Sequence, residues 1–173
     1  MNIFATHEDP RQCALALDDK RVGKMLMEAN LMLSRALQRH GAALAYGPGL
    51  AVAGQGYRGH PCTLWVGATR GNFTWLCAHA QALSDVFTMA YGKRHGSADR
   101  TPYLAGLRHC LPAGELLPFV NCARNDSCDM TWMDDPTMAY RSYLSARWHT
   151  DARAVTWTNR EPPSWHLWDP VFG

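Results

Sequence analysis

The stretch DDKRVGKMLMEAN at residues 18–30 decides how this chain should fold. Apolar residues recur in it and beyond it at every third or fourth position, and this spacing predicts one long amphipathic helix from Asp19 to about His40. Gly41 then ends the helix. An acidic residue at its start, Asp18 or Asp19, is expected to cap the first turn.

Charged residues line one flank of this helix. Lys20, Lys24 and Glu28 are four positions apart, so their side chains follow one another along the surface. Lys20, Arg21 and Lys24 would form a site for a phosphate or pyrophosphate group at the helix N-terminus, where backbone N–H groups already favour anions. Spacing alone favours the alternative, a solvated face held by i,i+4 ion pairs.

Length and composition point to a single domain. The chain has 173 residues, of which 47% are apolar, enough to bury a substantial core over residues 1–173. No secretion signal and no bilayer-length apolar run are present, which predicts a soluble intracellular protein without a membrane partner. In that setting the six cysteines are expected to be free thiols and not three disulfides.

Helix signals dominate the rest of the chain and predict an all-α fold. Asp9-Pro10 and Asp135-Pro136 each combine an N-cap with proline at the first helical position, which predicts helices at 11–17 and 137–148. The other expected segments are helical regions at 61–92, interrupted at Gly71, and at 103–109, a flexible loop at 41–59, one extended stretch at 154–158, and an irregular Pro- and Trp-rich tail at 156–173.

The net charge of +2 is unevenly distributed. Residues 11–40, 93–109 and 141–160 each carry three more positive than negative charges, whereas residues 110–140 are acidic. If the three basic blocks converge, they form a patch able to follow a nucleic-acid backbone. If they do not, they are ordinary surface charge, and composition leaves both interpretations open.

Several polar residues are candidates for a substrate cleft. Asn72, Trp75 and His79 are three and four positions apart and share a helix face that suits a planar base, or that is simply a buried face with its hydrogen bonds satisfied. His60 stands before Pro61 at a helix start, beside any bound anion or as an exposed cap. Lys93 and His95 follow a helix C-terminus and are either cleft cations or ordinary partners of the helix dipole.

The sequence excludes several other classes of site. Neither a Cys-x-x-Cys nor a His-x-x-x-His pair is present, so no metal site is predicted. The absence of a Walker-type loop and of a Gly-x-Ser-x-Gly elbow argues against a nucleoside triphosphatase and a serine hydrolase. Four tryptophans after residue 140 are interleaved with arginines, which is compatible with stacking on unpaired bases or with core filling.

Motifs spread over most of the chain together resemble a family of small bacteriophage proteins. They are MNIF at 1–4, LDDKRxxKMxxE at 17–28, HPCxxW with NxxWL at 60–76, YGKxH at 91–95, and WTxREPPxW at 157–165. The family is linked to thymine hypermodification in phage DNA and includes amino acid:DNA transferases and α-glutamyl/putrescinyl-thymine pyrophosphorylases. The loop at 41–59 matches no motif of the family.

The resemblance implies a transferase in the host cytoplasm during phage infection. A small amine or amino acid would displace pyrophosphate from 5-(pyrophosphoryloxymethyl)uracil in phage DNA. Cations would neutralise the leaving group, and a base would take the proton of the amine. Candidate catalytic residues are Asp19, Lys20, Lys24, Glu28 and His60, and candidate substrate-binding residues are Arg21, Arg70, Asn72, Trp75, His79, Lys93, His95 and Arg160.

The transferase reaction requires no cofactor, although Mg²⁺ can assist in neutralising pyrophosphate. A covalent route through Cys62 is rated below direct displacement. Two alternatives use the same residues: a small helical DNA glycosylase or lyase with Lys20 or Lys24 as an imine-forming amine, and a non-catalytic DNA-binding module.

Overall fold

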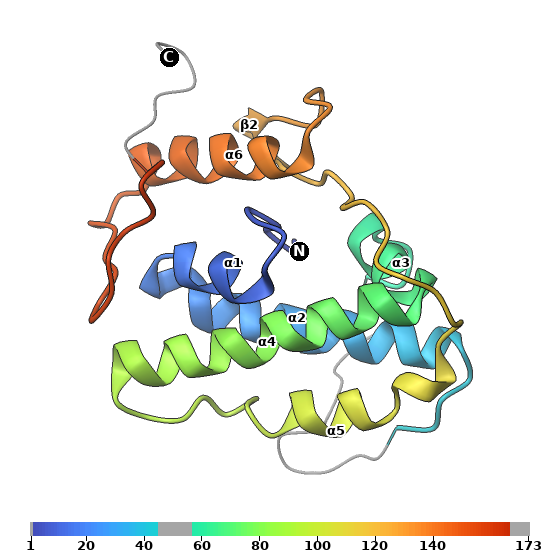
Figure 1. Cartoon of the computed structure of the whole chain (residues 1–173). Helices are drawn as coiled ribbons and strands as arrows, with labels where there is room; N and C mark the ends of the chain where they lie inside the picture. The colour runs from blue at the N-terminus through green and yellow to red at the C-terminus, as the bar shows by residue number, and fades with distance from the viewer. Residues whose placement is uncertain (1, 45–56, 167–173) are drawn as a thin grey trace.

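A computed structural model describes residues 2–44 and 57–166 of the chain (Figure 1). The all-α prediction is confirmed. Residues 45–56 of the expected loop and residues 167–173 of the expected tail lie outside the described residues. The elements are helices α1 (Pro10–Ala16), α2 (Asp19–Arg39), α3 (Pro61–Ala68), α4 (Arg70–Tyr91), α5 (Arg100–Gly106) and α6 (Pro136–Thr150), a 3-10 helix η1 (Arg108–Cys110), and strands β1 (Arg124–Asn125) and β2 (Cys128–Asp129).

The predicted Asp-Pro helix starts are confirmed. The Asp9 carboxylate accepts a hydrogen bond from the Arg11 backbone N–H at 2.8 Å, and Asp135 caps α6 in the same way. The cap of α2 differs from the expectation, because Asp18 occupies the N-cap position without a side-chain cap hydrogen bond. Its carboxylate instead accepts from Arg21 and Trp148, at 2.7 and 2.8 Å.

The break between α3 and α4 falls at Thr69, two residues before the expected position. Thr69 Oγ1 accepts from the Asn72 backbone N–H and donates to the Glu115 carbonyl, so it caps α4 and ties that helix to a neighbouring segment. Gly71 is required for this close approach, since a Cβ atom there would lie 2.4 Å from the Glu115 carbonyl carbon.

The predicted extended stretch at 154–158 is not a strand. Thr156 and Thr158 direct their hydrogen bonds to the Asp19 carboxylate and not to a partner strand. Within the described ranges the strands are β1 and β2, an antiparallel pair inside a segment that was expected to be irregular. A cross-strand partner is set by tertiary contacts, so local propensity did not reveal it.

The helices form a layered core. α2 packs against α3 and α4, and α1 packs against α4. α6 covers the N-terminal segment: Phe4 stacks on Tyr143 with ring centroids 6.1 Å apart and meets Tyr140 edge-on at 5.9 Å. Figure 1 shows α5 and α6 on opposite sides of the α1, α2 and α4 layer. The start of α3 lies beside the N-terminal segment, where the Ile3 backbone hydrogen-bonds with Cys62, whereas the start of α2 contacts the C-terminal segment through Asp19 and Thr156.

The state of the cysteines and the hydropathy of the helices were also predicted from the sequence. All six cysteines lie in described segments and are free thiols, as predicted. None of the helices in residues 2–44 and 57–166 combines the length and the hydropathy needed to cross a bilayer.

Candidate active site

Glu28 is an acidic group of the predicted catalytic set that lies beside a lysine amine. It lies on the third turn of α2 with its side chain 14% exposed, and Lys24 Nζ approaches its Oε1 at 3.8 Å from a side chain that is 66% exposed. The i,i+4 spacing on one helix places this amine and carboxylate together, as the sequence predicted. The Glu28 carboxylate also acts electrostatically on His60.

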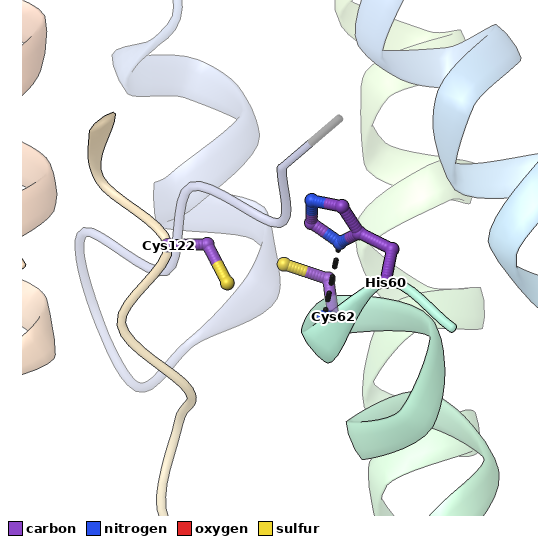
Figure 2. Close-up of side chains that lie close together, drawn as sticks. All are labelled: His60, Cys62 and Cys122. Atoms are coloured by element: carbon purple, nitrogen blue, oxygen red, sulfur yellow. Dashed lines mark hydrogen bonds between the residues drawn. The ribbon is translucent and has the colours of Figure 1, made fainter. Parts of the chain in front are cut away.

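His60 lies beside two cysteines that the site prediction did not include. His60 caps α3, Cys62 is on its first turn, and Cys122 comes from the segment that precedes β1. The ligating atoms of the three side chains lie within 4.8 Å of one another (Figure 2). The His60-x-Cys62 spacing was visible in the sequence, but Cys122 is 60 positions further along the chain, and no local pattern connects it to them.

The environment of these groups sets their protonation. Burial lowers the pKa of His60, and the Glu28 carboxylate partly opposes this shift. The hydrogen bond with Cys122, together with burial, raises the pKa of Cys62 well above its ordinary value. The same hydrogen bond lowers the pKa of Cys122, so Cys122 is the more readily ionised thiol of the two. This distribution disfavours Cys62 as an attacking nucleophile.

Asp19 joins the start of α2 to the C-terminal segment. Its carboxylate accepts hydrogen bonds from the Thr158 backbone and hydroxyl, from Thr156, and from Arg160 Nη1 at 2.7 Å. Burial would raise the pKa of Asp19, but the hydrogen bonds from Thr158, Arg160 and Thr156 lower it below its ordinary value. The Asp19 and Arg160 side chains are only 9% and 4% exposed. This arrangement favours a structural role over proton transfer for Asp19.

Lys20 and Arg21 are also engaged at this junction. Arg21 bridges Asp18 at 2.7 Å and Asp151 at 2.8 Å, and Lys20 Nζ contacts Asp151 at 3.1 Å. Asp151 directly follows α6 and supplies the negative charge that both cations share. At Lys20 and Arg21 the expected pyrophosphate site is therefore already paired with carboxylates of the protein, although the side chains of Lys20 and Lys24 remain 58% and 66% exposed.

Of the remaining predicted cations, His95 lies beside α2, because a Cβ atom at Gly23 would be 3.6 Å from its ring. Arg70, at the start of α4, donates to the Leu111 carbonyl at 3.3 Å. Lys93 is exposed after α4, and His95 packs edge-on against Phe87 with a centroid distance of 4.7 Å. Burial lowers the pKa of His95.

The basic blocks do not form one continuous patch. The blocks at 93–109 and 141–160 include α5 and most of α6, which lie on opposite sides of the molecule (Figure 1). The block at 11–40 reaches the C-terminal end of α6 through Lys20 and Arg21, but there the charges are balanced by Asp151. A nucleic-acid-binding surface on this protein would therefore not include all three basic blocks.

Asn72, Trp75 and His79 share a face of α4, as predicted, and that face is buried. Asn72 donates to the Trp65 carbonyl at 2.7 Å and accepts from the Leu117 N–H. The Trp75 indole N–H donates to the Glu8 carbonyl at 2.7 Å, and His79 Nδ1 pairs with the Pro10 carbonyl at 3.0 Å. These bonds hold α4 to neighbouring segments, which favours the alternative of a satisfied buried face.

His79 should make stability depend on pH. Burial lowers the pKa of His79 from 6.5 to about 4. The unfolded chain therefore takes up the proton first, and the native state should lose about 3 kcal/mol of unfolding free energy as pH falls from 6.5 to 4. Above pH 6.5 the full stability is retained. Urea unfolding at a series of pH values measures this loss.

The matched control is His79→Asn, whose amide can donate to the Pro10 carbonyl but does not titrate. The difference in unfolding free energy between the wild type and this variant should shrink as the pH falls toward 4. Parallel pH profiles for the two proteins would show that His79 does not cause the loss.

A cavity of about 450 Å³ adjoins the C-terminal segment. Arg160 and Arg141 lie on its wall, with α1 on one side and residues 161–165 on another. Arg141 donates to the Thr6 carbonyl at 2.9 Å and lies over the Trp165 ring. Arg160 thus borders this cavity, and its guanidinium also pairs with Asp19.

Comparison with known proteins identifies the family. The family model of pyrimidine dimer DNA glycosylases matches residues 1–89, just over half of the chain, which therefore belongs to this family. The family is one of enzymes that act on DNA. Neither the curated proteins nor the solved structures gave a match. Lys24, Glu28 and His60 lie inside the matched residues, whereas Cys122 and Arg160 lie outside them.

Proposed function

We propose that the protein is a DNA glycosylase that cleaves the N-glycosidic bond of a damaged pyrimidine, with Glu28 as its catalytic carboxylate. The observation that carries this proposal is the Glu28 side chain itself. It is largely buried on a rigid helix, lies beside the Lys24 amine, and belongs to the stretch that matches the glycosylase family.

The chemistry explains why a carboxylate is needed. When the bond from C1′ of the sugar to the base nitrogen breaks, the electron pair leaves with the base and positive charge develops on the sugar. A preorganised carboxylate stabilises that charge most strongly where water is largely excluded. Glu28 combines a largely buried side chain with an adjacent lysine amine inside the matched stretch, whereas the Asp19 carboxylate joins α2 to the C-terminal segment through Thr156, Thr158 and Arg160.

Lys24 is the lysine that fits the role of the attacking amine. Its nitrogen would form a bond to C1′ as the base departs with the electron pair and a proton, and opening of the sugar ring would then give an imine. Lys20, the other lysine on this flank, is held by Asp151. Lys24 has Glu28 as its ion-pair partner, so once the lysine nitrogen has bonded to C1′ and taken over the positive charge of the sugar, the carboxylate is in place to accept the proton that this nitrogen loses.

Borohydride capture tests this role. The protein is incubated with a duplex that carries one pyrimidine dimer, and an undamaged duplex of the same sequence serves as the substrate control. Borohydride should reduce the imine and leave a covalent protein–DNA complex with the damaged duplex only. Lys24→Ala should abolish the complex, and Lys20→Ala, the matched control on the same flank, should retain it. Equal capture by both variants would exclude Lys24 as the attacking amine.

An amine transferase acting on DNA with 5-(pyrophosphoryloxymethyl)uracil is the second candidate. The exposed Lys24 beside Glu28 supports it, since a cation and a base are the groups that this displacement needs. The ion pairs of Lys20 and Arg21 with carboxylates of the protein weigh against it.

Mass spectrometry distinguishes these functions. DNA that contains 5-(pyrophosphoryloxymethyl)uracil is incubated with the protein and with glycine, other amino acids or putrescine, and its nucleosides are then analysed. An amine adduct supports the transferase, and binding without any change of the DNA supports a non-catalytic module.

A further inference from the structure

The cluster formed by His60, Cys62 and Cys122 has no part in the proposed cleavage step. It brings one imidazole and two thiols from two separate segments to within 4.8 Å of one another. Figure 2 shows the two sulfur atoms and the imidazole ring gathered at the start of α3, with Cys122 on the facing segment. One nitrogen and two sulfur donors are a set that binds zinc, whereas Mg²⁺ and Ca²⁺ prefer oxygen ligands.

We propose that His60, Cys62 and Cys122 bind a zinc ion. Three protein ligands leave the fourth position of a tetrahedral zinc open for water or for another ligand. The proposal does not depend on the glycosylase function, because it rests only on the identity and the placement of these three donors.

The spacing of the donors is close to what zinc requires. With zinc–ligand bonds of about 2.0–2.3 Å, the ligand atoms of a tetrahedral site lie about 3.3–3.8 Å apart. The three atoms are within 4.8 Å, so side-chain rotations that move them by about 1 Å bring them to bonding distance. His60 Nδ1 accepts the Cys62 backbone N–H at 3.2 Å, and coordination through Nε2 would leave this cap intact.

The backbone holds the donors in place without an ion. Cys62 is fully buried on the first turn of α3. The Cys122 carbonyl accepts from Asn2 Nδ2 at 2.9 Å, and its N–H donates to the Tyr140 hydroxyl at 3.2 Å. The segment that carries Cys122 is thus fixed on both sides of the thiol, which lowers the entropy lost on binding an ion.

Metal titration of the full chain tests the proposal. The protein is stripped with a chelator under reducing conditions, and its affinity for zinc is measured by competition with a colorimetric chelator. The wild type should bind one equivalent. Cobalt, used as a spectroscopic substitute, should give thiolate-to-metal charge-transfer absorption, which a structural role of these cysteines would not produce.

Variants assign the ion to these residues. Cys122→Ser should weaken zinc binding by more than about 100-fold, beyond the loss typical of residues that only support a ligand. It should also weaken the thiolate-to-cobalt charge-transfer absorption, because one of the two thiolate ligands is lost. The matched control is Cys110→Ser, another half-buried free thiol outside the cluster, which should bind like the wild type. Circular dichroism checks that each variant is folded. A wild type that binds no zinc, or a folded Cys122→Ser that binds it as tightly as the wild type, would overturn the proposal.

Discussion

Asp19→Ala is expected to lower the free energy of unfolding by about 3–5 kcal/mol, the cost of breaking a buried ion pair from one side. The substitution leaves the Arg160 guanidinium, whose side chain is 4% exposed, without its carboxylate. It also removes the acceptor for Thr156 and Thr158, so the C-terminal segment loses its attachment to α2. Urea unfolding at neutral pH measures the change.

Asp85→Ala is the matched control for this prediction. Asp85 is an exposed carboxylate on α4 with one side-chain hydrogen bond, from Gln81. Its replacement should change the unfolding free energy by less than about 0.5 kcal/mol, as is usual for surface positions. If Asp19→Ala is as stable as Asp85→Ala, the junction between α2 and the C-terminal segment does not carry the stability assigned to it.

Glu28→Gln is expected to slow cleavage of the glycosidic bond by about 100- to 1000-fold, the usual cost of losing one preorganised electrostatic group. Glutamine keeps the shape of the side chain but cannot carry the negative charge that stabilises the sugar. Urea unfolding of the variant, measured in parallel, separates a loss of catalysis from a loss of folded protein. Single-turnover kinetics on a duplex with one pyrimidine dimer measure the rate.

The comparison variant for Glu28 is Lys20→Ala, which removes a charge from the same helix flank at a position bound to Asp151. It should cleave at close to the wild-type rate. A Glu28→Gln protein that cleaves as fast as Lys20→Ala would remove Glu28 from the mechanism.

The helical framework could be predicted from the sequence because its determinants are local. The 3.6-residue periodicity gave α2 to within one residue at its C-terminal end, and the Asp-Pro pairs located α1 and α6. Each of these signals acts over a few residues, within the reach of one helical turn. The pairing of β1 with β2 depends on tertiary packing, and the sequence did not reveal it.

The partners of the charged residues could not be predicted, because they come from distant parts of the chain. Asp18 accepts a hydrogen bond from Trp148, 130 residues further along the chain, and Asp19 accepts one from Arg160, 141 residues further along. A carboxylate at a helix start has the same sequence signature whether it faces a substrate or a buried arginine. Lys24 and Glu28 were predictable as a pair, since both lie on one helix, and their spacing already fixes their contact.

The most direct test of the glycosylase assignment is the fate of a duplex that carries a single pyrimidine dimer. After incubation with the wild-type protein and treatment with alkali, denaturing electrophoresis should show the damaged strand broken at the dimer and the undamaged duplex intact. A damaged strand that stays whole, under conditions in which the protein demonstrably binds the duplex, would contradict the assignment.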